Sequence, residues 1–226
     1  MASDRPDLPE GFLGAQPRFS ELKLRTDAHD DAEIHISGDN NVIIKLIAEE
    51  SVKVVTKLFQ VVSDKELPDF TFIQRKDKHN VEFHVSFPEN GWYKFMIFAL
   101  KETDTSESLP NVYNYLIYAS DLKDPAQGYA KTFTKFYADC CYLYEPLTLN
   151  AKSKDLTKVK FQLDVPNANK VAVHCVQEWF HLVQNDGYWE GTADLSKYRG
   201  KNSKVKVMAN YAKDGNTYSA LLEYAI

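Results

Sequence analysis

The chain contains two segments that end in the same way. Residues 93–99 form an aromatic and apolar run, and a polar loop separates them from the tyrosine-rich run 113–119. At the C-terminus, residues 204–212 and 218–226 repeat this order around a second polar loop. Each pair predicts a β-hairpin whose second strand is rich in aromatic residues. Two copies at a spacing of about a hundred residues predict two copies of one domain rather than a solenoid.

Alternation of apolar and polar residues runs through the rest of the chain, and helical periodicity is hard to find. The expected strands of the first half are residues 42–47, 51–59, 70–74 and 81–87. Those of the second half are residues 158–165, 170–176, 179–183 and 188–193. Turn residues separate these runs, and Asp186-Gly187 is a hairpin signal. About seven short strands in each half predict an all-β chain of two tandem antiparallel β-sandwiches.

The length of 226 residues suits two domains of about 100–150 residues each. A short polar seam with one Pro and one Gly lies at residues 121–128. We therefore expect an N-terminal extension at residues 1–20, a first sandwich at 21–121 and a second at 129–226.

Composition and charge exclude several classes of function. The net charge of −5 is mixed in sign along the chain, whereas nucleic-acid partners are usually met by a basic stripe. The longest apolar run, residues 95–100, is too short to span a bilayer. The first nine residues have no apolar segment of the signal-peptide type, and three cysteines make no disulfide framework. These observations predict a cytoplasmic protein that has no nucleic-acid partner and does not insert into a membrane.

The cysteines are candidates for a catalytic nucleophile. Cys140 and Cys141 are adjacent in an aromatic, strand-like setting. An activated thiol needs a lowered pKa, from a helix N-terminus or a neighbouring histidine, and neither follows these residues. The preferred interpretation is that they are structural, and a bridge from Cys175 to either of them stays open.

Metal and cofactor sites are not indicated. The six histidines occur singly, without the spacing of a zinc site. Asp27, Asp30, Asp31 and Glu33 form an acidic cluster that lacks the pattern of a calcium loop. No phosphate loop, dinucleotide fingerprint or serine elbow is present. We expect no metal and no cofactor.

Aromatic residues suggest two kinds of binding surface. Trp92, Trp179 and Trp189 could form a platform on which sugars stack, although most aromatics on alternating strands are core. Exposed tyrosines are good interface anchors, so the candidate binding residues are Tyr113, Tyr115 and Tyr118. The alternative is that half of these tyrosines are core. By hairpin position, Tyr115 and Tyr118 match Ala220 and Glu223, which predicts a shared framework with diverged surfaces.

Six segments together carry a resemblance to a known family. They are residues 11–19, 22–24, 34–36, 114–118, 141–147 and 221–224. In this order and spacing they resemble the region that follows the transglutaminase-like domain in the kyphoscoliosis peptidase and hillarin family. The resemblance covers nearly the whole chain.

The resemblance implies tandem immunoglobulin-like modules in an intracellular, cytoskeleton-associated protein, with filamin or septins as partners. Nothing in the chain matches the catalytic Cys, His or Asp segments of that family, and Cys141 looks like a strand cysteine of its accessory region. We therefore expect a non-catalytic protein-interaction module. The alternatives are an accessory region of a transglutaminase-like cysteine peptidase, a residual enzyme built on Cys140 or Cys141, and a carbohydrate-binding module.

Overall fold

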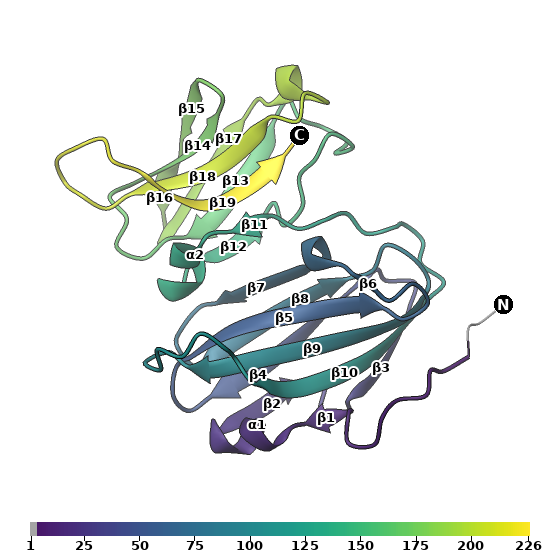
Figure 1. Cartoon of the computed structure of the whole chain (residues 1–226). Helices are drawn as coiled ribbons and strands as arrows, with labels where there is room; N and C mark the ends of the chain where they lie inside the picture. The colour runs from purple at the N-terminus through teal and green to yellow at the C-terminus, as the bar shows by residue number, and fades with distance from the viewer. Residues whose placement is uncertain (1–3) are drawn as a thin grey trace. The chain divides into compact units, whose positions relative to one another are not determined.

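The computed structural model describes residues 4–226 and divides into two compact units (Figure 1). Unit 1 comprises Met1–Ile73 and Asp77–Gln127, and unit 2 comprises Gln74–Lys76 and Gly128–Ile226. Both units consist almost wholly of β-strands, as predicted. Within the described residues no helix is long and apolar enough to cross a membrane.

Unit 1 contains two sheets. The first consists, in spatial order, of β1 (Gly14–Ala15), β10 (Asn111–Ser120), β9 (Gly91–Lys101), β5 (Val52–Gln60) and β6 (Lys65–Glu66), with β3 (Glu33–Ser37) also paired to β10. The second consists of β2 (Leu24–Ala28), β4 (Asn41–Ala48), β8 (Asn80–Ser86) and β7 (Thr71–Arg75), whose last two residues are grouped with unit 2. The helix α1 (Pro17–Glu21) and the 3₁₀ turn η1 (Pro68–Phe70) complete the unit.

Unit 2 also contains two sheets. The first consists of β11 (Lys131–Thr132), β19 (Ser219–Ala225), β18 (Lys204–Asn210), β14 (Lys170–Cys175) and β15 (Glu178–His181). The second consists of β12 (Tyr142–Glu145), β13 (Val159–Asp164), β17 (Tyr188–Ala193) and β16 (Val183–Asn185). The helix α2 (Thr134–Ala138) and the 3₁₀ turn η2 (Ser196–Tyr198) complete it.

The alternation seen in the sequence corresponds to burial in the strands. In β13, Val159, Phe161 and Leu163 are buried and Lys160 is exposed, as a strand with one buried face requires. The two sheets of each unit face each other across a core. Phe83 of β8 meets Phe95 of β9 in unit 1 with ring centroids 6.1 Å apart.

One pairing departs from the antiparallel order. The strand β3 runs parallel to β10, because the chain crosses from one sheet to the other between β2 and β3. The expected hairpin at Asp186-Gly187 is present: Asn185 pairs with Tyr188, and both turn residues have positive φ. This backbone geometry is the one that favours Asp-Gly in a two-residue turn.

The repeat extends to the start of each unit, which the sequence patterns did not predict. A two-residue strand, a five-residue helix and a residue with positive φ follow one another in both units at a constant offset. Lys23 (φ 51°) and Cys140 (φ 55°) are the equivalent residues, and the strands β2 and β12 follow them. These helices are too short for a periodic pattern to reveal them.

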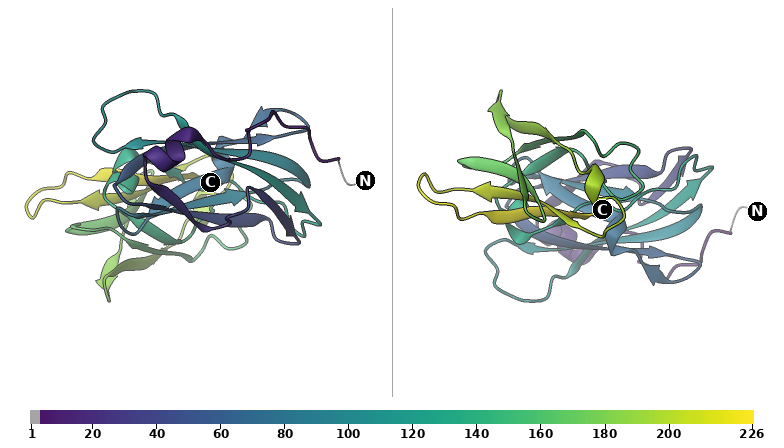
Figure 2. Two further views of the ribbon diagram at one scale, coloured as in Figure 1. Left: turned by 90° about the horizontal axis from the view of Figure 1, so that it is seen from below. Right: turned by 90° about the horizontal axis from the view of Figure 1, so that it is seen from above.

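The two closing hairpins are β9–β10 and β18–β19, and Figure 2 shows the long loop that joins each pair of strands. Both hairpins carry a register shift, between Asn111 and Tyr113 in the first and between Val207 and Met208 in the second. β1 pairs Gly14 with Asn114, and β11 pairs Lys131 with Glu223.

This register corrects the expected match between the hairpins. Tyr115 corresponds to Tyr224, not to Ala220, because each is the residue after the partner of the first short strand. Both closing strands therefore carry the same aromatic residue at the same position. The prediction was wrong because hairpin position in the sequence does not reveal a bulge.

Candidate functional site

The three candidate tyrosines occupy two different environments. Tyr113 and Tyr115 are buried, and burial raises the pKa of both phenols. Tyr113 donates a hydrogen bond to the carbonyl of Asp30 (3.2 Å), and Tyr115 donates to the carbonyl of His29 (3.1 Å). Tyr118 is half-buried on the outer side of β10. Of the three, Tyr118 is the residue that lines a cavity.

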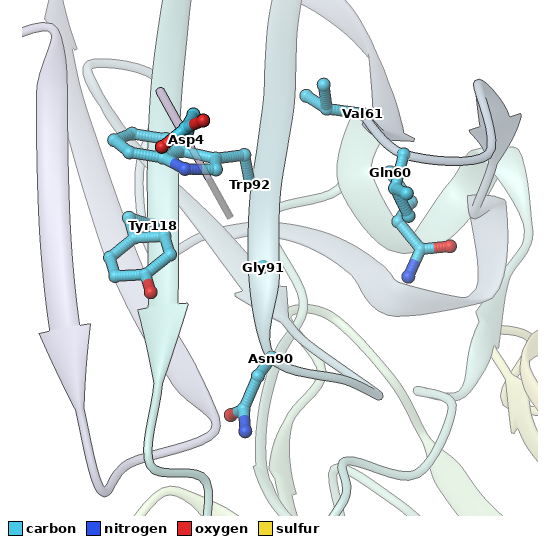
Figure 3. Close-up of a pocket in the computed structure, with 8 residues that line it drawn as sticks. Asp4, Gln60, Val61, Asn90, Gly91, Trp92 and Tyr118 are labelled. Atoms are coloured by element: carbon cyan, nitrogen blue, oxygen red, sulfur yellow. The ribbon is translucent and has the colours of Figure 1, made fainter. Parts of the chain in front are cut away.

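This cavity lies in unit 1 and has a volume of about 310 Å³. Figure 3 shows the ring of Tyr118 beside the indole of Trp92, and Asp4, Gln60 and Gly91 also line the cavity. The Trp92 and Tyr118 ring centroids are 4.6 Å apart, and the two planes are tilted by 33°. The imidazole of His35, on the neighbouring strand β3, contacts both rings edge-on.

The polar groups of the cavity come from loops and strand ends. Asn90 Oδ1 accepts a hydrogen bond from the amide of Leu122 (3.0 Å), and Gln60 Nε2 donates to Glu89 (2.8 Å). Gly91 has a φ of 142°, and a side chain added there would meet no atom within 4 Å. The glycine therefore leaves the floor of the cavity open.

Sequence reasoning missed most of these residues. Tyr118 was a candidate and Trp92 was considered for a sugar platform, but Asp4, Gln60 and Gly91 were not considered. They come from three distant segments and carry no shared motif, so the fold alone brings them together. The one available signal was Gly91 directly before Trp92, since a strand glycine often marks a close approach.

The cysteines lack the features of a nucleophile. All three are free, Cys140 is half-buried, and Cys141 and Cys175 are buried. Burial raises the pKa of the Cys141 thiol to about 12 and also raises that of Cys175. A thiol of this kind is almost wholly protonated near neutral pH, whereas catalysis needs the thiolate.

The histidines lie apart from one another. His84 is buried on β8 beside Glu82 (3.3 Å), and His35 contacts Glu33 (2.9 Å). His79, just before β8 begins, donates a hydrogen bond from Nδ1 to the carbonyl of Ala48 (2.9 Å). Across residues 4–226, no three His, Cys, Asp or Glu side chains are grouped as metal ligands would be.

The tryptophans differ in exposure. Trp92 and Trp189 are each 7% exposed, whereas Trp179 is 40% exposed. Trp179 lies on β15, where its ring packs against His174 (centroids 4.3 Å apart) and Tyr218 (4.9 Å). Val176 and Val183, which flank this strand, are 59% and 69% exposed. Exposed apolar residues therefore lie on β15 and on either side of it in the sequence, with Val183 already in β16 of the other sheet; we call Val176, Trp179 and Val183 the β15 edge.

The backbone of the β15 edge is open to pairing. The amide of Leu182 donates to the carbonyl of Val171 on β14, and inward-pointing amides alternate along an antiparallel strand. The N–H groups of Trp179 and His181 therefore point away from β14, and neither has an acceptor within residues 4–226.

The equivalent edge of unit 1 differs. There the strand that follows β5 is β6, two residues long, and both Lys65 and Glu66 are charged and exposed. Lys53 and Lys57 flank the one exposed apolar residue of β5, Val55. Short strands and lysines are common ways to prevent a sheet edge from pairing with another chain. β15 is twice as long as β6 and carries no lysine, and its one carboxylate, Glu178, is paired with Lys197 (2.9 Å).

Two facing sheets in each unit, joined in this strand order, define tandem immunoglobulin-like β-sandwiches. The family model described as "KY-like, immunoglobulin-like domain" matches residues 6–129, more than half of the chain. The chain belongs to this family.

Curated relatives agree with this assignment. The chain is 26% identical to the proteins named kyphoscoliosis peptidase of Homo sapiens and of Mus musculus, in each case over 212 residues and 92% of the chain. The chain spans 31% of the length of each relative. The match extends the family resemblance through both units.

Solved structures with similarity to the chain include a tandem of titin Ig domains and neural ectodermal development factor IMP-L2. The titin tandem is 11% identical, with a TM-score of 0.23, over 84% of this chain and 90% of its own. IMP-L2 is 10% identical, with a TM-score of 0.29, over 87% of this chain and 91% of its own. At these TM-scores the two likenesses support no inference about the chain.

Proposed function

We propose that the chain is a non-catalytic protein-interaction module, and that the β15 edge accepts an extended segment of a protein partner. The observation that carries this proposal is the difference between the two equivalent edges. Unit 1 ends its sheet with a two-residue charged strand, and unit 2 ends its sheet with a four-residue strand that carries the exposed Trp179.

Strand addition would use both the backbone and the side chains of this edge. The outward N–H groups of Trp179 and His181 would bond to carbonyls of the incoming strand. Trp179 would supply the buried aromatic anchor that dominates many interfaces. Its ring already packs against His174 and Tyr218, so little side-chain freedom would be lost on binding.

The neighbouring side chains indicate the chemistry of the partner. Trp179 favours an apolar residue opposite it, since aromatic and β-branched cross-strand pairs are stabilising. His181 is exposed on the same side of the strand and favours an acidic or hydrogen-bond-accepting residue. We therefore expect an extended segment that alternates apolar and acidic positions.

The family resemblance suggests which proteins the partner could be. The family resemblance suggests a cytoplasmic, cytoskeleton-associated protein that binds filamin or septins, and the named relatives are kyphoscoliosis peptidases. On this proposal the chain corresponds to a region that recognises partners rather than to one that carries out catalysis. The buried thiol of Cys141, with its raised pKa, is consistent with a structural cysteine.

Binding of purified filamin and septin fragments, measured by calorimetry, tests the proposal. Replacing Trp179 by Lys places a charge on the edge and should weaken binding about 30-fold, the loss typical of a tryptophan anchor. The matched control is Val55→Lys, which alters an exposed apolar residue on the edge of unit 1 and should leave the affinity unchanged.

Two results would overturn different parts of the proposal. Failure of every filamin and septin fragment to bind removes the suggested partners. Binding that survives Trp179→Lys with its full affinity removes the β15 edge as the site.

A carbohydrate-binding module is the second candidate, favoured by the exposed indole of Trp179. Against it, Trp92 and Trp189 are buried, so the three tryptophans do not form one exposed platform. Tryptophan fluorescence on a panel of glycans tests this candidate, and an unchanged spectrum across the panel removes it.

A further inference from the structure

We propose that the cavity lined by Trp92 and Tyr118 binds a cationic side chain, arginine or lysine, from a protein segment. This site is in unit 1 and does not depend on the β15 edge. The cavity volume of about 310 Å³ is near the lower limit of ligand pockets, which suits a single side chain rather than a larger ligand.

The aromatic rings supply the first attraction. A guanidinium or ammonium group over the face of a tryptophan or tyrosine is attracted by the negative face of the ring. Trp92 and Tyr118 lie 4.6 Å apart and line the same cavity, and His35 holds their edges from the neighbouring strand. The two rings therefore present a preformed surface to the cation (Figure 3).

The charges around the cavity supply the second attraction. Asp4 also lines the cavity, and within residues 4–226 its carboxylate makes no ion pair or hydrogen bond. The next residue, Arg5, is bound to Glu33 (2.8 Å) and does not line the cavity. The lining thus contains one carboxylate and no Lys or Arg among the described residues, which favours a cation and disfavours an anion.

The floor of the cavity permits close approach. A side chain at Gly91 would meet no atom within 4 Å, so the space above this backbone is open. Asn90 also lines the cavity, and its Oδ1, which already accepts from the Leu122 amide (3.0 Å), has a second lone pair to which a guanidinium could donate. Arginine, with five donors in a planar fork, should therefore bind better than lysine.

The test is an NMR titration of the whole ¹⁵N-labelled chain with N-acetyl-arginine amide. The matched ligand is N-acetyl-citrulline amide, which has almost the same shape and no charge. We expect saturable shifts of the Trp92 indole N–H and the Gly91 amide with the arginine ligand, and much smaller shifts with the citrulline ligand. Equal shifts with both ligands, or shifts confined to other residues, would overturn the proposal.

Variants test the attraction by the aromatic rings and the attraction by the Asp4 carboxylate separately. Asp4→Asn should weaken arginine binding about threefold to tenfold, whereas Asp7→Asn, an exposed carboxylate in the same segment that does not line the cavity, should leave it unchanged. Tyr118→Ala should abolish saturable binding, and the dispersion of the amide spectrum reports whether this variant folds. Unchanged affinity in both Asp4→Asn and a folded Tyr118→Ala would contradict the proposal.

Discussion

Tyr115 and Tyr224 make the same hydrogen bond in the two units. The Tyr115 hydroxyl donates to the carbonyl of His29 (3.1 Å), and the Tyr224 hydroxyl donates to the carbonyl of Pro146 (2.7 Å). His29 follows β2 and Pro146 follows β12, so each bond ties the last strand of a unit to the segment after the equivalent early strand. The duplicated framework thus includes a shared polar contact in each core.

Replacement of either tyrosine by phenylalanine should destabilise its own unit by about 1 kcal/mol, the net value of a typical hydrogen bond. Tyr218→Phe is the control, because its hydroxyl makes no such bond among the described residues 4–226 and its loss should cost far less. Urea titrations followed by amide resonances report each unit separately. If a variant loses stability in the unit that does not contain the substitution, or if neither unit loses stability, the two hydrogen bonds do not stabilise their units in the same way.

Glycine at the positive-φ position after each short helix should stabilise the chain. Lys23 and Cys140 adopt φ values of 51° and 55°, which cost most side chains roughly 1–2 kcal/mol relative to glycine. The greater entropy of glycine in the unfolded chain offsets part of this gain, so Lys23→Gly and Cys140→Gly should each add up to about 1 kcal/mol.

Denaturation midpoints of these two variants measure the effect. The control is Leu22→Gly, where φ is −82° and the side chain is buried, and this change should destabilise. Similar losses in all three variants would mean that the left-handed residues are not strained.

Iodoacetamide should label Cys140 and leave Cys141 and Cys175 unmodified in the folded chain. A pKa of about 12 for Cys141, against a usual value of 9.0, makes its thiolate fraction near neutral pH about a thousandfold smaller. Mass spectrometry of tryptic peptides identifies the labelled residue. Labelling of Cys141 faster than a free cysteine would support a residual enzyme and contradict the structural role given to this thiol.

Stability should fall at alkaline pH. Burial raises the pKa of Cys141 from 9.0 to about 12 and that of Tyr93 from 10.0 to about 12. A group whose pKa is higher in the folded than in the unfolded chain adds to the free energy of unfolding. This stabilisation is fully present below the unfolded-state pKa and is lost as the pH rises through the folded-state pKa. The free energy of unfolding should therefore decline between about pH 9 and pH 12.

Cys141→Ala should make this decline shallower than it is in the unchanged chain. Urea titrations at a series of pH values measure both slopes. An unaltered slope in Cys141→Ala would show that this thiol does not contribute to the pH dependence.

Much of the fold could be predicted from the sequence because its strands have one buried face. The run that became β4 buries Val42, Ile44 and Leu46, and this alternation is visible without a structure. The Asp186-Gly187 turn was predictable for a similar reason, since its conformation depends on local residue preference. The short helices α1 and α2 were not predictable, because five residues are too few to show a helical period.

The candidate binding sites were harder to predict than the strands, because they depend on tertiary structure. Trp92, Trp179 and Trp189 all lie on strands, and the sequence does not distinguish the exposed one from the two buried ones. Exposure of Trp179 follows from the place of β15 at the edge of its sheet, which is a property of the strand order. The cavity beside Tyr118 likewise combines a strand end, a loop and the N-terminal segment.

Amide hydrogen exchange at the β15 edge tests the proposed interaction most directly. In the free chain, the N–H groups of Trp179 and His181 point away from β14 and should exchange quickly, whereas that of Leu182, bonded to Val171, should be protected. Addition of a filamin or septin fragment that binds should protect Trp179 and His181 as its strand pairs with β15. Tight binding that leaves these two amides exchanging at their free rates would contradict strand addition at this edge.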